Sequence, residues 1–231
     1  MAHTARYAVL TGDIVASSRT SPEGRRHLPE LIRAAGEDLP RRYREAVHGE
    51  IDVFRGDSWQ MVLGQPREAL RIAVFLRARL RSEPGFRRLD SRISIGFGSI
   101  AYLPDQNVST GNGQAFQLSG EGLEALPNHA WMSLSFPRQQ RSVITQGLNV
   151  VVQLMDLQVQ RWTGKQAEAV SGALIDLTQR EIATAWFREQ VTQQTISQHL
   201  DGAGWVQVKD GLSYFEDVLP RVFGAGVDTV G

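Results

Sequence analysis

Two Gly-Asp pairs are the residues of this chain whose type and position most clearly suggest chemistry. Asp13 ends the apolar run of LTGDIVASS, and Asp57 lies in FRGDSWQ between two short apolar segments. If the first strand and the second Gly-Asp turn are neighbours in one sheet, both carboxylates reach the same edge of that sheet. Two carboxylates without sulfur ligands suit Mg²⁺ or Mn²⁺, and the backbone carbonyl of Ile14 is a usual third ligand. Such a site holds a nucleoside triphosphate and supports in-line displacement.

The competing interpretation is turn chemistry, since Asp caps backbone amides and Gly adopts positive φ angles. Two such pairs, each beside a strand and a small or hydroxyl residue, favour the metal site. Ser17 and Ser18 follow Asp13 and are expected either to contact triphosphate oxygens or to act as turn hydroxyls. The loop VSTGNGQ is a weaker candidate: Gly111, Gly113 and the helix start after them either present amides to a phosphate or form a flexible connection.

Several other kinds of chemistry are excluded. The chain has 231 residues and no cysteine, which removes disulfides, thiolate catalysis and cysteine-based zinc sites. Its five histidines are scattered singly, without metal-ligand spacing, and no G-x-S-x-G elbow is present. Gly96 and Gly98 lack the third glycine of a dinucleotide fingerprint and indicate a close backbone approach or a bulge.

Composition predicts a cytoplasmic protein with no membrane partner. The formal net charge is zero. The first residues lack the pattern of a signal peptide, and no apolar run approaches the roughly 18 residues that a membrane span needs.

Apolar patterning orders the first part of the chain as an α+β domain. We expect strands at 7–15, 91–103 and 131–136, a hairpin over 50–63, and helices over 24–47, 65–81 and 115–126, the first of them broken near Pro40. This order predicts a mixed sheet crossed by helices, a ferredoxin-like pattern.

The pattern changes after Pro137. Residues 139–162 predict one long helix rich in Gln and Val. In one interpretation, this helix would pair with the same helix of a second copy of the chain. Its apolar stripe is too irregular to predict a coiled coil. The part after Pro137 contains eight basic and ten acidic residues, a net charge of −2. This balance weighs against tight binding of duplex DNA, which rests on neutralised phosphates.

The segment TQREIATAWFREQVTQQTISQHL has the spacing of a helix-turn-helix. Thr178 and Glu181 form a capping box, and Thr192 caps the second helix. The outward positions of that helix carry side chains that contact bases and phosphates in a major groove: Thr192, Gln193, Gln194, Thr195, Ser197 and Gln198. The following WVQV is expected to form a small wing. Expected partners are duplex DNA or, alternatively, a protein surface or a second copy.

In this order LTGDIVASSR, RGDSWQMVL, ISIGFGSI and GQAFQLSGEGLEAL resemble the SatD-like family of bacterial proteins. The resemblance covers residues 7–136 and implies a palm-type fold like that of class III nucleotidyl cyclases. A C-terminal winged helix-turn-helix, common in the family, extends it to about residue 219. It implies metal ligation by Asp13, Ile14 and Asp57.

The sequence departs from the cyclase pattern at two positions. Gln117 stands where cyclases have an Asn that contacts the nucleotide, and Glu121 stands where they have a transition-state Arg. A transition-state arginine contributes on the order of 10³–10⁵ in rate, so an acid there argues against efficient cyclase chemistry unless another cation substitutes. Arg19 and Arg55 are the candidates by proximity to the two aspartates.

These observations predict a palm domain at 1–137, a connecting helix at 138–162 and an all-α winged helix-turn-helix domain at 163–231. The leading hypothesis is a regulator in which a nucleotide bound with Mg²⁺ or Mn²⁺ controls the helix-turn-helix module. An active, metal-dependent nucleotidyl cyclase-like enzyme is the first alternative. The second is a degenerate palm domain that serves as a scaffold for a DNA-binding or dimerisation module.

Overall fold

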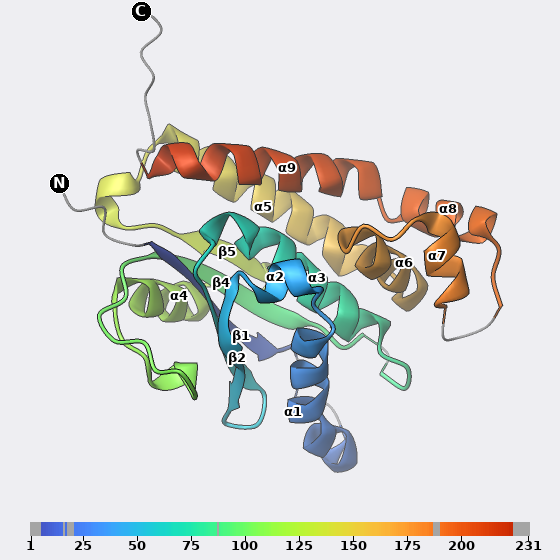
Figure 1. Ribbon diagram of the computed structural model, residues 1–231, viewed down its shortest axis with the longest axis horizontal. Coiled ribbons are helices and arrows are strands. Elements are labelled where there is room, and N and C mark those ends of the chain that lie inside the picture. Colours follow the sequence, from blue (N-terminus) through green and yellow to red (C-terminus); the bar gives the residue numbers. More distant parts are fainter. Residues whose placement is uncertain (1–5, 16, 18–20, 87, 187–189, 224–231) are drawn as a thin grey trace, which may run out of the picture.

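A five-stranded mixed sheet forms the centre of the computed structural model, which describes residues 6–15, 17, 21–86, 88–186 and 190–223 (Figure 1). The strand order is β2-β3-β1-β4-β5, and all neighbours are antiparallel except β4 and β5. The strands are β1 (Tyr7–Ile14), β2 (Val47–Phe54), β3 (Ser58–Leu63), β4 (Ser91–Gly98) and β5 (Met132–Ser135). The expected mixed sheet of an α+β protein is therefore confirmed.

From α1 to α5 the helices follow the expected order, with bounds that differ by a few residues. The helices are α1 (Pro22–Glu37), α2 (Arg41–Arg44), α3 (Ala69–Ser82), α4 (Gln114–Glu124), α5 (Val143–Arg161), α6 (Gly164–Leu174), α7 (Gln179–Thr184), α8 (Gln193–Gly202) and α9 (Trp205–Val222). The expected break near Pro40 is confirmed, because Pro40 occupies the N-cap of α2 and lacks the amide that would continue α1. Within the described ranges, no helix has the length and apolar character needed to cross a membrane.

The strands alternate between an apolar and a polar face. Leu10, Trp59 and Ile95 belong to the large hydrophobic core that also contains side chains of α1, α3, α5 and α9. Their neighbours along the strands point to the opposite face, which α4 covers: the Thr11 hydroxyl is 2.7 Å from the hydroxyl of Ser119 on that helix. The period of two thus separates a dry face from a face rich in hydroxyl and charged groups.

Gly96 lets α4 approach the sheet closely, as the glycine pattern of this strand predicts. A Cβ atom at position 96 would lie 2.3 Å from the carbonyl oxygen of Ala115 and 2.4 Å from the amide nitrogen of Ser119. These contacts are with backbone atoms, so the helix itself would have to shift.

We expect Gly96→Ala to lower the free energy of unfolding by about 1–3 kcal/mol, the usual cost of overpacking. Gly120→Ala is the matched control on α4, because a Cβ there has no neighbour within 4 Å. That variant should be neutral or more stable by up to about 1 kcal/mol, since alanine favours helix over glycine. Urea unfolding of both variants measures the difference, and equal stabilities would contradict the packing described for α4.

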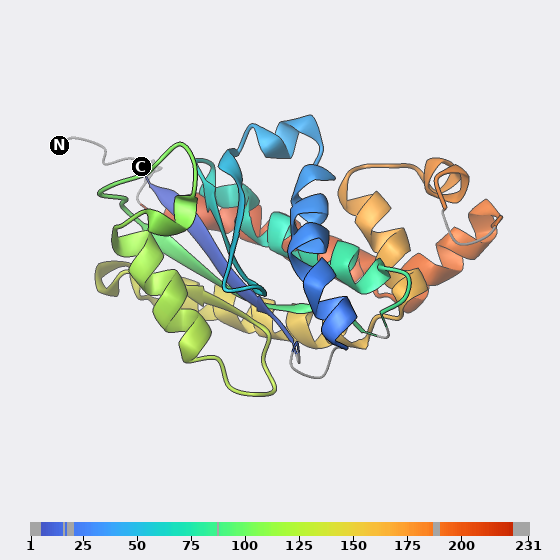
Figure 2. The ribbon, with the colours of Figure 1, turned by 90° about the horizontal axis from the view of Figure 1, so that it is seen from below.

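The C-terminal helices share the large core with the sheet. Phe215 of α9 packs against Phe97 of β4 with ring centroids 6.3 Å apart. Arg71 of α3 forms a nearly buried ion pair with Glu216 of α9, with Nε 2.6 Å from Oε1. Helices α6, α7 and α8 lie together at one end of the molecule in both views (Figures 1 and 2). The core cluster runs without interruption from the sheet into these helices.

The prediction of a wing after α8 is wrong. Trp205–Val222, which contains both WVQV and LSYFEDVL, is the single helix α9. Its buried residues Val208, Leu212, Phe215 and Leu219 recur every three or four positions. This helical period lets one apolar stripe pack against α5, and it outweighs the β propensity of the short WVQV segment.

Helix α5 covers the free edge of the sheet. Its Asn149 side chain accepts a hydrogen bond from the Leu134 amide at 3.1 Å. The Oδ2 atom of its Asp156 accepts bonds from the amides of Trp131 at 2.6 Å and Met132 at 3.2 Å. Edge amides left unpaired invite pairing with other chains, so these two side chains close the outer edge of β5.

Candidate functional site

The two Gly-Asp segments lie side by side at one end of the sheet. Asp13, near the end of β1, is the register partner of Ser58 on β3, the residue after Asp57. The amide of Ile14 also donates a hydrogen bond to the carbonyl oxygen of Asp57 at 3.2 Å. The hairpin before Asp57 turns through Arg55 and Gly56, both with positive φ. The antiparallel pairing of β1 and β3 therefore brings two distant segments of the sequence together.

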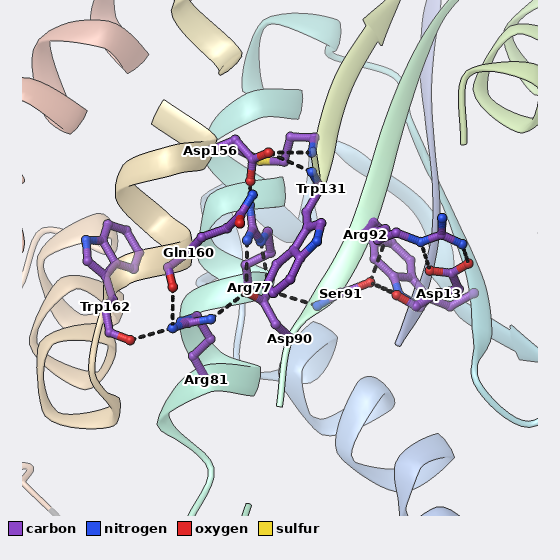
Figure 3. A network of polar contacts seen from close by, with 12 residues as sticks. Asp13, Arg77, Arg81, Asp90, Ser91, Arg92, Trp131, Asp156, Gln160 and Trp162 are labelled. Carbon is purple, nitrogen blue, oxygen red and sulfur yellow. Dashed lines mark hydrogen bonds and ion pairs between the residues drawn. The ribbon is translucent and has the colours of Figure 1, made fainter. Parts of the chain in front are cut away.

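The Asp13 carboxylate is held by an arginine of the next strand. Nε of Arg92 donates to Oδ1 of Asp13 at 2.8 Å, and Nη2 donates to Oδ2, so that the pair is bidentate (Figure 3). The two side chains are 22% and 34% exposed for Asp13 and Arg92, respectively, which places the pair at the surface of the sheet end. The hydrogen bond to Asp13 raises the pKa of Arg92 above its usual range; partial burial opposes this rise and the carboxylate charge supports it.

The Asp57 carboxylate, unlike that of Asp13, is not paired with an arginine among the described residues. It is partly exposed, and none of the described residues donates a recorded hydrogen bond or ion pair to it. Arg55 is exposed, and no ion pair joins it to either aspartate among the described residues. Ser17 is partly buried after the end of β1, whereas Ser18 and Arg19 lie outside the described residues. The site thus contains one neutralised and one available carboxylate.

A polar row crosses the same face of the sheet two residues from Asp13. Gln60, Thr11, Ser94 and Ser133 are successive register partners on β3, β1, β4 and β5. The Gln60 amide donates to the Thr11 hydroxyl at 3.0 Å. Three further polar atoms of the row are buried and have no hydrogen-bond partner among the described residues: Oε1 of Gln60 and the hydroxyls of Ser94 and Ser133.

Orphaned polar atoms are costly in a protein interior unless a ligand or water meets them. The row ends at Ser133, which lines a cavity of about 360 Å³ between the end of α4, β5 and α5. Helix α4 covers this row, since a Cβ atom at Gly122 would lie 2.3 Å from the Ser94 hydroxyl, so the row is part of the packing between α4 and the sheet.

The Gly-rich loop lies at the other end of the sheet. Gly113 approaches the backbone of Ser99 and Ile100, which follow β4, whereas Asp13 pairs with Arg92 near the start of that strand. Six strand positions separate the two ends, about 20 Å at the usual rise. Gln117 of α4 is exposed and faces away from the sheet. Within one chain, Gly113 and Gln117 are therefore not brought to the two aspartates.

Directly beneath the site lies a buried ionic network. Arg77 of α3 is fully buried and donates to both oxygens of Asp90 at 2.8 Å each, and to Oδ1 of Asp156 on α5 at 2.6 Å (Figure 3). Burial disfavours the charge of Arg77, but the two carboxylates more than compensate and raise its pKa. Arg81 adds a bond to Asp90 at 2.7 Å.

Two hydrogen bonds connect this network to the aspartate site. The Asp90 carbonyl accepts a bond from the Val15 amide at 2.9 Å, directly after the site segment of β1. The Ser91 hydroxyl donates to the Asp13 carbonyl at 2.8 Å. The site and α5 are therefore joined through Asp90, Arg77 and Asp156.

The helix-turn-helix prediction is borne out in its helices and caps. Thr178 and Glu181 form the expected capping box, and the Thr192 side chain accepts a bond from the Thr195 amide. Ile196 and Leu200 are buried. Of the proposed DNA-contacting residues, four are exposed and two partly buried: Thr192, Gln193, Gln194 and Gln198, then Thr195 and Ser197.

Arg92 is the site residue that our sequence reasoning missed. The signal lay in the alternation of SRISIGFG, in which Ile93, Ile95 and Phe97 mark the core face. Arg92 and Ser94 then fall on the other face together with Asp13. Aligning the period-two pattern across neighbouring strands would have placed an arginine beside the aspartate.

Asp13 and Asp57 are the candidate ligands for a divalent cation at this end of the sheet. In the part of the chain that the structure describes, no three His, Cys, Asp or Glu side chains form a group able to hold a metal. Mg²⁺ commonly binds through one or two carboxylates and completes its shell with water and phosphate oxygens, so two aspartates suffice when a nucleotide is bound. Comparison with protein-family models and with curated proteins found no match to this chain.

Proposed function

We propose that the sheet domain binds a nucleoside triphosphate together with Mg²⁺ or Mn²⁺, and that the occupancy of this site controls the C-terminal helical module. The observation that carries the proposal is the adjacency of the two Gly-Asp segments, which the hydrogen bond from Ile14 to Asp57 fixes. We further propose that the sheet domain is palm-like and that the chain is SatD-like.

In this proposal Asp13, Asp57 and the Ile14 carbonyl would hold the cation, which would supply positive charge to neutralise the phosphates. Arg92 keeps Asp13 neutralised in the free protein. With a cation at Asp13, the Arg92 guanidinium would be free to pair with a phosphate; arginine suits this role because its planar donors match phosphate oxygens. Ser17 and Ser18 remain candidate nucleotide contacts, whereas Gly113 and Gln117 are too far from the two aspartates to contact the same nucleotide within one chain.

The buried network provides the route to the C-terminal module. A shift of β1 or β4 at the aspartate end acts on Asp90, and through Arg77 on Asp156 of α5. Helix α5 in turn contacts the junction of α8 and α9, because its Gln158 donates to the Ala203 carbonyl at 2.9 Å. A rigid hydrogen-bonded connection of this kind is able to transmit a two-state change.

The module itself is proposed to contact duplex DNA through α8. Its exposed Gln and Thr side chains suit base and phosphate contacts. A net charge of −2 after Pro137 predicts weak binding that requires two copies. Gel shifts with the upstream DNA of its own gene, at 50 and 200 mM salt, test this role. If no complex forms at either salt, with or without nucleotide, the proposed binding of this DNA is overturned.

An active nucleotidyl cyclase-like enzyme is the second candidate, and Arg92 favours it. The position of the cyclase arginine holds Glu121, but Arg92 places another cation at the aspartates. Incubation with α-³²P-labelled triphosphates and Mn²⁺ tests this candidate. A cyclic product with release of pyrophosphate supports it, and recovery of intact triphosphate after overnight incubation rejects it.

The nucleotide proposal is tested by titration calorimetry with ATP, GTP, CTP and UTP, each with and without 2 mM Mn²⁺. We expect at least one nucleotide to bind with micromolar affinity in the presence of the metal and at least tenfold more weakly without it. Absence of heat with all four nucleotides in both conditions overturns the proposal.

We also propose that α5 pairs with α5 of a second copy. Its outward face has a 4-3-4-3 spacing of Val143, Gly147, Val150, Leu154 and Leu157, and the four apolar side chains are 83%, 54%, 64% and 47% exposed. This spacing is the seam of a coiled coil. The sequence pattern is irregular because a buried stripe and this exposed stripe overlap on one helix.

The lack of exposed charge on this face of α5 is compatible with pairing to the same face of a second copy. Between Ser142 and Gln160 the one charged residue of α5 is Asp156, which is buried, so a second copy meets no repulsion along the seam. Gly147 leaves room for close approach, because a Cβ there has no neighbour within 4 Å. The face thus presents apolar area and no charge for a differently charged partner to recognise.

We expect Leu154→Glu to convert the protein from twice the monomer mass to the monomer mass in size-exclusion chromatography with light scattering. A buried carboxylate at the seam costs several kcal/mol of association. Val206→Glu, at a 59% exposed position of α9 outside the seam, is the matched control and should leave the dimer intact. A wild-type protein that is monomeric at 100 µM would contradict the pairing.

A further inference from the structure

The indole of Trp59 connects the two strands that flank β1 at the aspartate end of the sheet. Trp59 lies on β3 and Ser91 lies on β4, with β1 between these two strands. Nε1 of Trp59 donates a hydrogen bond to the Ser91 hydroxyl at 3.0 Å, and both residues are fully buried. A bond between side chains of β3 and β4 requires the indole to cross β1.

Gly12 of β1 provides the space for this crossing. A Cβ atom at position 12 would lie 2.5 Å from both Cε2 and Cζ2 of Trp59. Gly12 does not have a positive φ angle, so the need for space, and not backbone conformation, explains a glycine here. The first Gly-Asp pair therefore contains a packing contact of Trp59, which the turn interpretation of this pair does not account for.

The Ser91 hydroxyl joins the indole to the backbone of Asp13. Its oxygen lies 2.8 Å from the Asp13 carbonyl oxygen and 3.0 Å from the Arg92 carbonyl oxygen. A hydroxyl has one proton and two lone pairs. Because the indole N–H of Trp59 occupies one lone pair of this hydroxyl, its proton is directed toward the two carbonyls.

The peptide group between Asp13 and Ile14 is consequently held at both ends. Its carbonyl accepts the bond from Ser91 on the side of β4. Its amide donates to the Asp57 carbonyl at 3.2 Å on the side of β3. The orientation of this peptide group is therefore fixed by contacts with both neighbouring strands.

The next peptide group shows the consequence for the Ile14 carbonyl. The Val15 amide donates to the Asp90 carbonyl at 2.9 Å. In a trans peptide the carbonyl points away from the amide, so the Ile14 carbonyl points away from Asp90 and toward the side of the Asp57 segment. The third candidate ligand of the site thus has its direction set by the backbone hydrogen bonds around it.

We propose that Trp59 and Ser91 are positioning residues of the aspartate site: they fix the peptide group between Asp13 and Ile14, and with it the direction of the Ile14 carbonyl. This inference rests on the proposed cation and nucleotide site and names residues that set its geometry. Trp59 and Ser91 lie on the apolar face and the Asp13 side chain on the other, so they act through the backbone. Binding sites need such supporting residues, locked by packing and hydrogen bonds.

Amide hydrogen exchange in the free full-length protein tests the positioning role without any ligand. Ser91→Ala removes the bond to the Asp13 carbonyl. It should raise the exchange rate of the Ile14 amide about 3- to 10-fold relative to that of the Leu10 amide, the value of one hydrogen bond. A loss of global stability acts on both amides of β1, so the ratio of the two rates separates positioning from stability.

Ser119→Ala is the matched control for this ratio. Ser119 is also fully buried, and its hydroxyl lies 2.7 Å from that of Thr11, but it makes no recorded contact with Asp13. The variant loses a buried hydrogen bond of the same kind and should keep the wild-type exchange ratio.

Trp59→Phe tests the other half of the contact. It keeps an aromatic ring beside Gly12, removes the donor to Ser91, and should raise the exchange ratio in the same direction as Ser91→Ala. It also identifies the Trp59 indole signal in spectra of the ¹⁵N-labelled protein, because that signal is then missing. In Ser91→Ala the Trp59 indole proton should move upfield, as the loss of its acceptor requires.

Calorimetry with Mn²⁺ and the nucleotide that the wild-type protein binds tests the link to the site. Ser91→Ala should bind about 3- to 10-fold more weakly, and Ser119→Ala as tightly as wild type. An unchanged exchange ratio in Ser91→Ala, or a raised ratio with wild-type affinity, would overturn the inference. Lack of binding by the wild type overturns the proposed function as well, and it is recognised because the wild type and every variant then bind nothing.

Discussion

Asp57→Asn is expected to abolish the rise in melting temperature that Mn²⁺ and the preferred nucleoside triphosphate produce in the wild-type protein. A ligand at one hundred times its Kd stabilises the folded state by about 2.7 kcal/mol. For a chain of this length that corresponds to a rise of roughly 5–10 °C. The amide keeps the size of the carboxylate but loses the charge that holds the cation, and differential scanning fluorimetry measures the difference.

The unliganded Asp57→Asn protein should melt within about 2 °C of wild type, because no described residue makes a recorded bond to the Asp57 carboxylate. Asp210→Asn, at an exposed position of α9, is the matched control and should retain the full ligand-dependent rise. If Asp57→Asn keeps that rise, the metal site lies elsewhere and the regulatory proposal fails.

Arg77→Met is expected to destabilise the protein more than any other single change at the network. The substitution leaves Asp90 and Asp156 buried without their cation, and breaking a buried pair from one side costs about 3–5 kcal/mol. The melting temperature should fall by on the order of 10 °C. Chemical unfolding followed by circular dichroism gives the free energy directly.

Arg79→Met is the control on the same helix. Arg79 pairs with Asp38, and the two side chains are 26% and 46% exposed, so the loss should stay within about 1 kcal/mol. Similar losses of unfolding free energy in the two variants would show that burial does not determine how much each ion pair contributes to stability. The coupling route through α5 would then lose its physical basis.

The sequence predicts the local features of this protein well. The period-two strands, the break at Pro40 and the caps at Thr178 and Thr192 depend on neighbours within a few residues, and the structure has all of them. The Gly-Asp turn between β2 and β3 was also predicted, whereas its adjacency to Asp13 was only a condition of the metal-site hypothesis, which the pairing of β1 with β3 meets. Such features carry their physical cause in the segment itself.

Features that depend on distant partners escaped prediction. Arg77 and Asp156 are 79 residues apart, and nothing in either segment marks them as a pair. The WVQV segment resembles a strand in isolation, but the apolar stripe of α9 and its contact with α5 make it helical. Arg92 is a polar residue in an apolar strand, and its role follows from its register with Asp13. Tertiary packing, which overrides local propensity, decided each of these cases.

Crystals grown with Mn²⁺ and the preferred triphosphate test the central claim most directly, through the anomalous scattering of manganese. Our account predicts one peak within about 2.5 Å of carboxylate oxygens from both Asp13 and Asp57, with Arg92 turned toward a phosphate. A manganese peak away from this end of the sheet, or Asp13 still paired with Arg92 beside a bound nucleotide, would contradict it.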